Sequence, residues 1–442
     1  MDTSLTLPCG AILKNRIAKA AMTEGLATFD GRSTDELCNL YRVWAEGGAG
    51  LLITGNVQID SEHLERIGNV MIEGTPDEDR MARLRKYAEA GTRNNTHLWA
   101  QISHAGRQTN PTVNQAPKAM SAVPVKVPGF GNPVELTIAE IEQIVERFAT
   151  AALALKAAGF TGIQIHGAHG YLIASSLSPL ANLRTDKYGG SLENRARMLL
   201  DIIHACRAAV GPAFPISVKI NSADFQHGGF TSDDCFVVVD WLQKASVDLI
   251  EISGGTYESP EMFSGTKLKA EHDAAKKKEE ETNALKQQST LAREAYFVKF
   301  AQQMREKVNI PLMVTGGFRT RSVMEHAVAT QSVDVVGIAR PMCIMTDAPQ
   351  KLLDGTVDIL PSYEDNVGVP LYASIFSKFR IGRSANIAAV VMYLYAQIYA
   401  IARNGVADEN MSRVVALYNA YTHDSKLLPE YTAWRKEVNT KA

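Results

Sequence analysis

The alternation of short apolar runs with longer amphipathic segments constrains this chain most. Runs of four to eight apolar, β-branched residues predict strands, and apolar residues at helical spacing predict the helices between them. Eight strands are expected, at Arg16–Met22, Gly50–Gly55, His97–Ile102, Gly162–His166, Ile216–Ile220, Leu249–Ser253, Leu312–Thr315 and Val333–Ile338. Helices are expected at Asp35–Gly47, Asp77–Arg93, Ile138–Ala158, Leu192–Val210, Ser232–Lys244, Leu291–Lys307 and Thr320–Ala329.

Eight strands that alternate with helices predict an α/β protein of the (β/α)8 TIM-barrel type. A doubly wound sheet is the structural alternative, and it normally carries a glycine-rich fingerprint after its first strand. Here the first strand leads into Thr23-Glu24-Gly25, which is no such fingerprint. We therefore expect a barrel domain over residues 1–360 and a C-terminal helical extension over residues 361–442, packed on the barrel or on a dimer partner.

The C-terminal extension contains one long apolar stretch, Ala385–Ala402, in which only Asn386 and Gln397 are polar. Its length just reaches the threshold for a membrane-spanning helix. Its alanine and tyrosine content favours instead a helix buried against the barrel or in a homodimer interface. A second helical pattern follows near Met411–Tyr421.

The segment Glu271–Gln288 is dense in charged residues and lies between the sixth strand and its helix. Such a segment is most simply a solvated loop. A lid over a bound ligand is the alternative, because loops at this end of a barrel build active sites.

Charge and cysteine content exclude several classes of protein. A formal net charge of -2 over 442 residues argues against nucleic-acid or membrane-surface binding as a bulk electrostatic function. None of the five cysteines forms a C-x-x-C pair, which argues against a zinc ribbon, an iron–sulfur cluster or a disulfide scaffold. The N-terminus lacks a basic segment followed by an apolar run, so we expect no secretory signal and a cytoplasmic protein.

Residues that could carry chemistry follow the fourth strand, where a TIM barrel places catalytic groups. His166 and His169 are imidazoles that can stabilise negative charge developing on a carbonyl oxygen. Tyr171 is a phenol that can deliver a proton. Two packed histidines in a glycine-rich turn, or a pair of metal ligands, are the alternatives.

Other strand ends point to a planar, phosphorylated ligand. Gln101 lies on the third strand, and its amide can both donate to and accept from a heterocycle. Lys219, on the fifth strand, is either a cation at the barrel mouth or half of a structural ion pair. The seventh and eighth strands end near Gly316–Gly317 and Gly337, whose free backbone N–H groups suit a phosphate, with Arg340 as a charged partner.

The chain also contains the twelve-residue motif Arg184-Thr185-Asp186-Lys187-Tyr188-Gly189-Gly190-Ser191-Leu192-Glu193-Asn194-Arg195. This motif and the residues above resemble the old yellow enzyme family of FMN-dependent NAD(P)H:flavin oxidoreductases and ene-reductases. The resemblance runs from about residue 5 to residue 355. Further motifs that match the family are Lys14–Arg16, Trp99–Gln101, His104–Gln108 and Arg293–Phe297. The long motif is itself structural, with Ser191 expected as a helix N-cap.

The resemblance implies roles for residues of this chain. The residues expected to hold FMN, by resemblance or by position at a strand end, are Ala21, Met22, Thr23, Gly55, Gln101, Lys219, Gly316, Gly317, Gly337 and Arg340. His166 and His169 would bind the substrate carbonyl or the nicotinamide amide, and Tyr171 would be the proton donor. Gly25 stands where some relatives carry an aromatic residue, which implies a more open pocket here.

The family's chemistry implies an oxidoreductase in which NADPH or NADH passes a hydride to FMN. An electron-poor alkene conjugated to a carbonyl would then be reduced in the same pocket. The alternative is a flavoenzyme of a biosynthetic pathway that catalyses a different net reaction there, such as an oxidation, isomerisation or cyclisation. A barrel that binds flavin or ligand without turnover is a further alternative.

Overall fold

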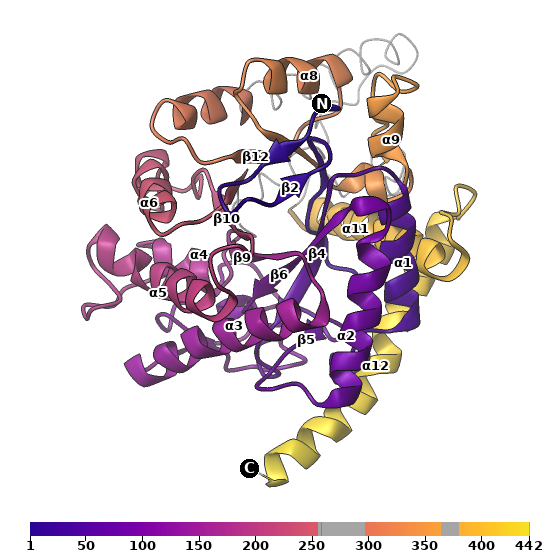
Figure 1. Cartoon of the computed structure of the whole chain (residues 1–442). Helices are drawn as coiled ribbons and strands as arrows, with labels where there is room; N and C mark the ends of the chain where they lie inside the picture. Colours follow the sequence, from indigo (N-terminus) through magenta and orange to yellow (C-terminus); the bar gives the residue numbers. More distant parts are fainter. Residues whose placement is uncertain (255–257, 259–296, 364–379, 442) are drawn as a thin grey trace.

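The computed structural model describes residues 1–254, 258, 297–363 and 380–441, and within them eight parallel strands close into a barrel (Figure 1). The pairing order is β3-β13-β12-β11-β10-β9-β6-β4, and pairing of β3 with β4 completes the circle. The strands are β3 (Ile17–Lys19), β4 (Leu51–Gln58), β6 (His97–Ser103), β9 (Gly162–Gly167), β10 (Ile216–Asn221), β11 (Leu249–Ser253), β12 (Leu312–Thr315) and β13 (Val335–Ile338). The predicted (β/α)8 barrel is therefore confirmed.

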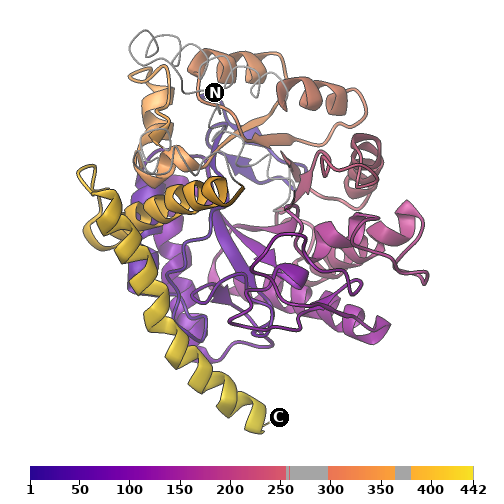
Figure 2. The ribbon, with the colours of Figure 1, turned by 180° about the vertical axis from the view of Figure 1, so that it is seen from behind.

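Helices surround the barrel, as Figure 2 shows from behind. They are α1 (Asp35–Glu46), α2 (Glu78–Gly91), α3 (Ile138–Ala158), α4 (Leu172–Leu177), α5 (Leu192–Val210), α6 (Ser232–Lys244), α8 (Arg321–Ala329) and α9 (Ala348–Leu353), with short 3-10 turns η1 (Arg93–Asn95), η2 (Gly106–Gln108) and η4 (Arg340–Cys343). Threonine or serine caps fix several helix starts; Thr137, for example, forms a capping box with Glu140 at the start of α3. Of the helix expected at 291–307, residues 297–305 are described and helical.

Short strands that the sequence patterns did not predict lie outside the barrel wall. They are β1 (Leu5–Thr6), β2 (Ile12–Leu13), β5 (Val70–Met71), β7 (Lys118–Ala119) and β8 (Val134–Glu135). Each has two residues, too few to display a period of two. The β1–β2 hairpin nonetheless has a structural role, because its leucines cluster with apolar side chains of the barrel interior.

The interior of the barrel changes character along its axis. One cluster of buried apolar side chains contains Leu5, Leu7, Leu13, Ala18, Ala20, Leu51, Ile53, Trp99, Leu249, Met313 and Val335. Two residues further along the strands, the same alternation places polar side chains inside, among them Gln101, Lys219 and Glu251, all buried. Toward the C-terminal ends of the strands, the barrel interior therefore has a layer of polar side chains, and an apolar layer lies below it.

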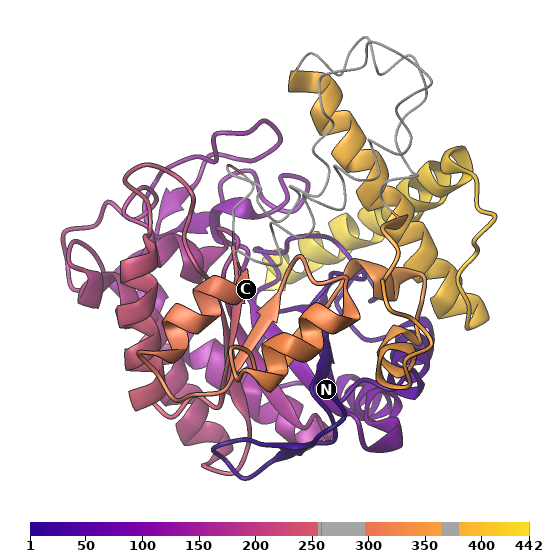
Figure 3. The ribbon, with the colours of Figure 1, turned by 90° about the horizontal axis from the view of Figure 1, so that it is seen from above.

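The C-terminal extension forms two helices, α11 (Arg380–Asn404) and α12 (Arg413–Lys441), which lie beside the barrel (Figure 3). α11 packs against α1 of the same chain, where Asn39 donates to the carbonyl of Ala402 at 2.7 Å. Arg403 pairs with Glu36 at 3.3 Å. The second half of the predicted apolar helix, from Val390 to Ala402, thus packs on the barrel of its own chain.

Among the described helices, none is long and apolar enough to cross a bilayer. α12 is longer than the predicted Met411–Tyr421 segment because its second half packs on the barrel loops, with Tyr431 buried beside Leu64 and Ile67. The charged segment Glu271–Gln288 lies outside the described residues, as do residues 364–379 at the start of the extension.

Candidate active site

The residues that the sequence singled out lie at or just beyond the C-terminal ends of the barrel strands. Ala21, Met22 and Thr23 follow β3, Gly55 lies in β4, Gln101 in β6, His166 in β9, Lys219 in β10 and Gly337 in β13, whereas His169 and Tyr171 follow β9, Gly316 and Gly317 follow β12, and Arg340 begins η4. Because all eight strands are parallel, this places them around one mouth of the barrel.

A chain of buried polar side chains crosses the barrel at this level. Gln101 donates to Gln164 at 2.7 Å, and Gln164 donates to Glu251 at 2.8 Å. Glu251 in turn pairs with Lys219 at 2.8 Å. Lys219 is therefore held in an ion pair, as one of the two sequence interpretations stated, and its charge is balanced inside the barrel. Glu251 and Gln164 were not predicted, although each is a polar residue between two isoleucines of its strand.

His166, His169 and Tyr171 gather beside this chain. The ring centroids of His166 and His169 lie 5.2 Å apart, and those of His166 and Tyr171 lie 4.9 Å apart. His169 has a left-handed backbone with φ 63°, and its ring nitrogen Nε2 is 2.8 Å from Ser253 Oγ. Its carbonyl accepts from Gln108 at 3.1 Å. The turn after β9 is thus fixed from several sides.

Burial sets the protonation of both histidines. Burial first, then the neighbouring His169 and Lys219, hold the pKa of His166 well below its usual range. The pKa of His169 is lowered in the same way, by burial and then by Lys219. Both rings are therefore neutral near pH 7. His166 Nδ1 accepts from the Ala168 N–H at 3.3 Å, so its hydrogen lies on Nε2.

Glycines line the ends of β12 and β13. Gly316 and Gly317 have φ of 125° and 91°, which favour glycine over other residues. A Cβ on Gly337 would overlap Thr315 Oγ1, a buried hydroxyl with no hydrogen-bond partner among the described residues. Arg340 lies two residues after β13. At this edge of the mouth, the groups that face a ligand are therefore backbone atoms and one hydroxyl.

The segment after β3 forms the adjoining edge of the mouth, because β3 pairs directly with β13. A Cβ on Gly55 would lie 2.5 Å from the carbonyl oxygen of Met22, so these backbones are in close contact. Thr23 donates to Glu65 at 2.7 Å, and Asn56 donates to the same carboxylate. Glu65 was not predicted, because nothing in its local sequence distinguishes it from an exposed loop residue.

The space beside Gly25, expected to be open, is filled by another side chain. A Cβ on Gly25 would lie 2.9 Å from the Arg66 guanidinium carbon. The same guanidinium lies 4.1 Å from the ring centroid of Tyr395 on α11 and donates to the Tyr399 hydroxyl at 2.6 Å. The C-terminal extension therefore supplies the aromatic groups near this position.

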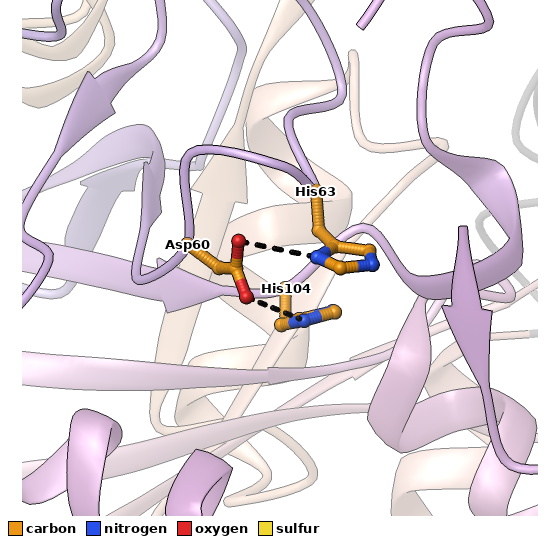
Figure 4. Close-up of side chains that lie close together, drawn as sticks. All are labelled: Asp60, His63 and His104. Carbon is orange, nitrogen blue, oxygen red and sulfur yellow. Dashed lines mark ion pairs between the residues drawn. The ribbon is translucent and has the colours of Figure 1, made fainter. Parts of the chain in front are cut away.

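A second polar cluster lies next to the mouth and was not predicted. Asp60, His63 and His104 are buried together between the loop after β4 and the end of β6 (Figure 4). His63 Nδ1 and His104 Nε2 lie 3.2 Å and 3.8 Å from the Asp60 carboxylate, and the two rings stack with centroids 4.5 Å apart. The three residue types and their spacing could suit a metal ion.

The hydrogen bonds around this cluster argue against a metal. His63 Nε2 accepts from the Lys118 N–H at 2.9 Å, and His104 Nδ1 accepts from the Gly106 N–H at 3.0 Å. In neutral rings the hydrogens must then lie on the nitrogens that face Asp60, where they leave no lone pair for an ion. Arg147 also donates to Asp60 at 2.6 Å. The cluster is therefore a carboxylate that accepts hydrogen bonds from Arg147 and from the Glu62 N–H, with two imidazoles beside it.

Comparison with known proteins gives relatives over most of the chain. It is 37% identical over 372 residues to the NADH-dependent flavin oxidoreductase iliE of Hypocrea jecorina, covering 79% of this chain and 88% of the relative. It is 33% identical to the protein of the same name from Neonectria sp., covering 89% of this chain but only 52% of that longer relative.

Among solved structures, an old yellow enzyme homologue from Zymomonas mobilis aligns with a TM-score of 0.64 and 21% identity, covering 82% of this chain and 95% of that one; this likeness concerns the fold. The sequence profile of the NADH:flavin oxidoreductase / NADH oxidase family matches residues 9–358. The family match and these relatives support FMN as the cofactor and NADH or NADPH as its reductant. The chain belongs to the NADH:flavin oxidoreductase / NADH oxidase family, which includes the old yellow enzymes.

Proposed function

We propose that this protein is an FMN-dependent oxidoreductase that takes hydride from NADH or NADPH and reduces the C=C bond of an α,β-unsaturated carbonyl compound. The observation that carries the proposal is the cluster of His166, His169 and Tyr171 at the barrel mouth, with two neutral imidazoles and a phenol in ring contact. These groups suit a substrate that has an oxygen to bind and a carbon to protonate.

The residues present fit FMN. The glycines that end β12 and β13 leave backbone without side chains there, and the Thr315 hydroxyl beside them has no partner among the described residues. Gly316, Gly317, Gly337 and Arg340 would hold the phosphate.

The flavin ring would lie over the layer of polar side chains in the barrel interior. Gln101 and Lys219 would face it from the interior, with Ala21, Met22, Thr23 and Gly55 along its edge. Glu251 pairs with Lys219, so the buried ammonium has a carboxylate partner. Bound FMN would supply hydride transfer from the nicotinamide and to the alkene.

The two histidines would bind the substrate oxygen as neutral donors. His166 presents its Nε2 hydrogen because Nδ1 accepts from the backbone. If Ser253 donates to Nε2 of His169, that ring keeps its hydrogen on Nδ1. Two fixed N–H groups would then polarise the carbonyl as negative charge develops on its oxygen. Tyr171, in contact with His166, would protonate the α carbon.

The proposal is tested by separating the two half-reactions in anaerobic stopped-flow experiments. In Tyr171→Phe, reoxidation of the reduced protein by 2-cyclohexen-1-one should slow by about 10²–10⁴-fold, the usual contribution of a positioned proton donor. Reduction by NADH should change little, because it needs no proton from the phenol. Tyr188→Phe is the control, since the Tyr188 hydroxyl donates to Asp201 instead. Equal losses in both half-reactions of Tyr171→Phe would contradict the assignment.

The oxygen-binding role has a separate test at equilibrium. Replacing both His166 and His169 with alanine should raise the dissociation constant of 4-hydroxybenzaldehyde at least tenfold, because the phenolate loses both donors. The dissociation constant is measured from the visible spectrum of the FMN-loaded protein. Unchanged binding would remove the role in oxygen binding.

A further inference from the structure

A groove lies between the barrel mouth and the C-terminal helices. Its volume is about 600 Å³. Loops of the mouth provide one wall, including Glu65, Arg66 and Gln108. α11 and α12 provide the other, including Tyr395 and Leu428. Neither wall belongs to β9 or to the turn after it, where His166, His169 and Tyr171 lie, so the groove extends the pocket outward rather than repeating it.

The helices that form the outer wall are fixed to the mouth loops by specific contacts. His423 Nε2 lies 2.7 Å from the carbonyl oxygen of Gly25, and its ring stacks on Tyr399 with centroids 4.3 Å apart. Further along α12, the Tyr431 hydroxyl donates to the carbonyl of Ser61 at 2.7 Å. The C-terminal helices are therefore held against the mouth loops and form a defined wall of the groove.

Two residues connect the groove to the proposed reaction centre. Glu65 lines the groove and accepts from Thr23, which is expected at the flavin edge. Gln108 lines the groove and donates to the carbonyl of His169. A molecule whose reacting group lies between His166 and His169 would therefore extend into the groove.

The groove also has an unused polar group. Gln108 is only 2% exposed, and its Oε1 accepts no hydrogen bond from any described residue. A buried acceptor without a partner is unfavourable unless a ligand or water satisfies it. The remaining lining combines aromatic and apolar side chains such as Tyr395, Met392 and Leu428 with a few polar ones.

Resting on the proposed function, we propose that this groove binds the distal, non-reacting part of an extended enone, and that the C-terminal helices thereby determine substrate size. The class is a multi-ring or chain-extended α,β-unsaturated ketone with an apolar or aromatic body. A volume of about 600 Å³ beyond the reaction centre suits such a molecule, since drug-sized ligands occupy pockets of roughly 300–1,000 Å³. A small cyclic enone would leave the groove empty.

The test fills the groove from an exposed position. Ser425 lines the groove on α12, and Ser425→Trp places an indole there. Lys426→Trp is the matched control, because Lys426 is the next residue, is exposed, and does not line the groove. Both FMN-loaded variants are compared with the wild type for 2-cyclohexen-1-one and for chalcone. The dissociation constant comes from the visible spectrum, and kcat/KM from NADH consumption.

In Ser425→Trp the dissociation constant of chalcone should rise at least tenfold, and that of 2-cyclohexen-1-one should stay within twofold. Lys426→Trp should change neither. Equal effects on both enones, no effect on chalcone, or a wild type that does not bind chalcone would overturn the groove proposal. If chalcone binding responds as expected but no enone is reduced by any protein, the groove proposal stands and the proposed reaction falls.

Discussion

The Asp60–His63–His104 cluster makes a specific prediction about acid stability. His104 is buried, and burial, followed by the nearby His63, lowers its pKa from the ordinary 6.5 to about 3. The folded protein thus keeps this ring neutral at a pH where the unfolded chain protonates it. His104→Asn removes the titration while leaving an amide oxygen that can accept from the Gly106 N–H.

The sign and size follow from proton linkage. Between pH 6.5 and about 3 the unfolded chain binds one more proton at His104 than the folded chain, so stability falls as the pH falls through this window. The stability is fully present above pH 6.5. At about 1.4 kcal/mol per pH unit for one proton, this residue should lower the free energy of unfolding by about 2 kcal/mol between pH 7 and pH 5.

The assay is equilibrium urea unfolding at pH 7, 6 and 5 with the same excess of FMN in every sample. His104→Asn should be less stable than the wild type at pH 7, by about 1–3 kcal/mol for a buried substitution. Its stability should then fall by about 2 kcal/mol less on acidification. His204→Asn is the control, because His204 is exposed on α5. Parallel pH dependences for wild type and His104→Asn would refute the reasoning.

Three further predictions concern packing and charge. Glu251→Leu should lower the free energy of unfolding by about 3–5 kcal/mol, because it leaves Lys219 buried without its partner, and adding Lys219→Met should recover most of the loss in urea unfolding. Gly337→Ala should lower stability by about 1–3 kcal/mol through overlap with Thr315, and Thr315→Ala in the same chain should relieve it; no rescue would contradict the steric cause. Tyr431→Phe should cost about 1 kcal/mol and speed hydrogen exchange in α12, whereas unchanged exchange there would show that this hydroxyl does not hold the helix.

Much of the barrel could be predicted because its strands carry strong local signals. The run that became β9 was predicted at Gly162–His166 and is Gly162–Gly167, since β-branched residues and flanking glycines define it. The hairpin of Leu5–Thr6 and Ile12–Leu13 could not be predicted, because two-residue strands have no periodicity. It is stabilised by tertiary contacts, since its leucines pack on apolar side chains of the barrel interior.

The site was predictable to the extent that one strand end carries several of its residues. His166, His169 and Tyr171 stand within six positions, so their sequence spacing already places them together. Glu251 and Asp60 contact partners on other strands, helices or loops. The local sequence around either residue does not indicate these contacts. The helical pattern in the sequence ends at Tyr421, whereas α12 continues to Lys441. The second half of this helix is held by tertiary contacts with the barrel loops and not by a periodicity of its own.

The visible spectrum of the purified protein during anaerobic titration with NADH, and then NADPH, tests the central claim most directly. We predict a yellow protein, or one that becomes yellow on addition of FMN, whose absorbance at about 450 nm disappears on addition of the reduced nicotinamide. A colourless protein that takes up no FMN would contradict the cofactor assignment. An FMN-loaded protein that neither nucleotide reduces would contradict the proposed hydride transfer.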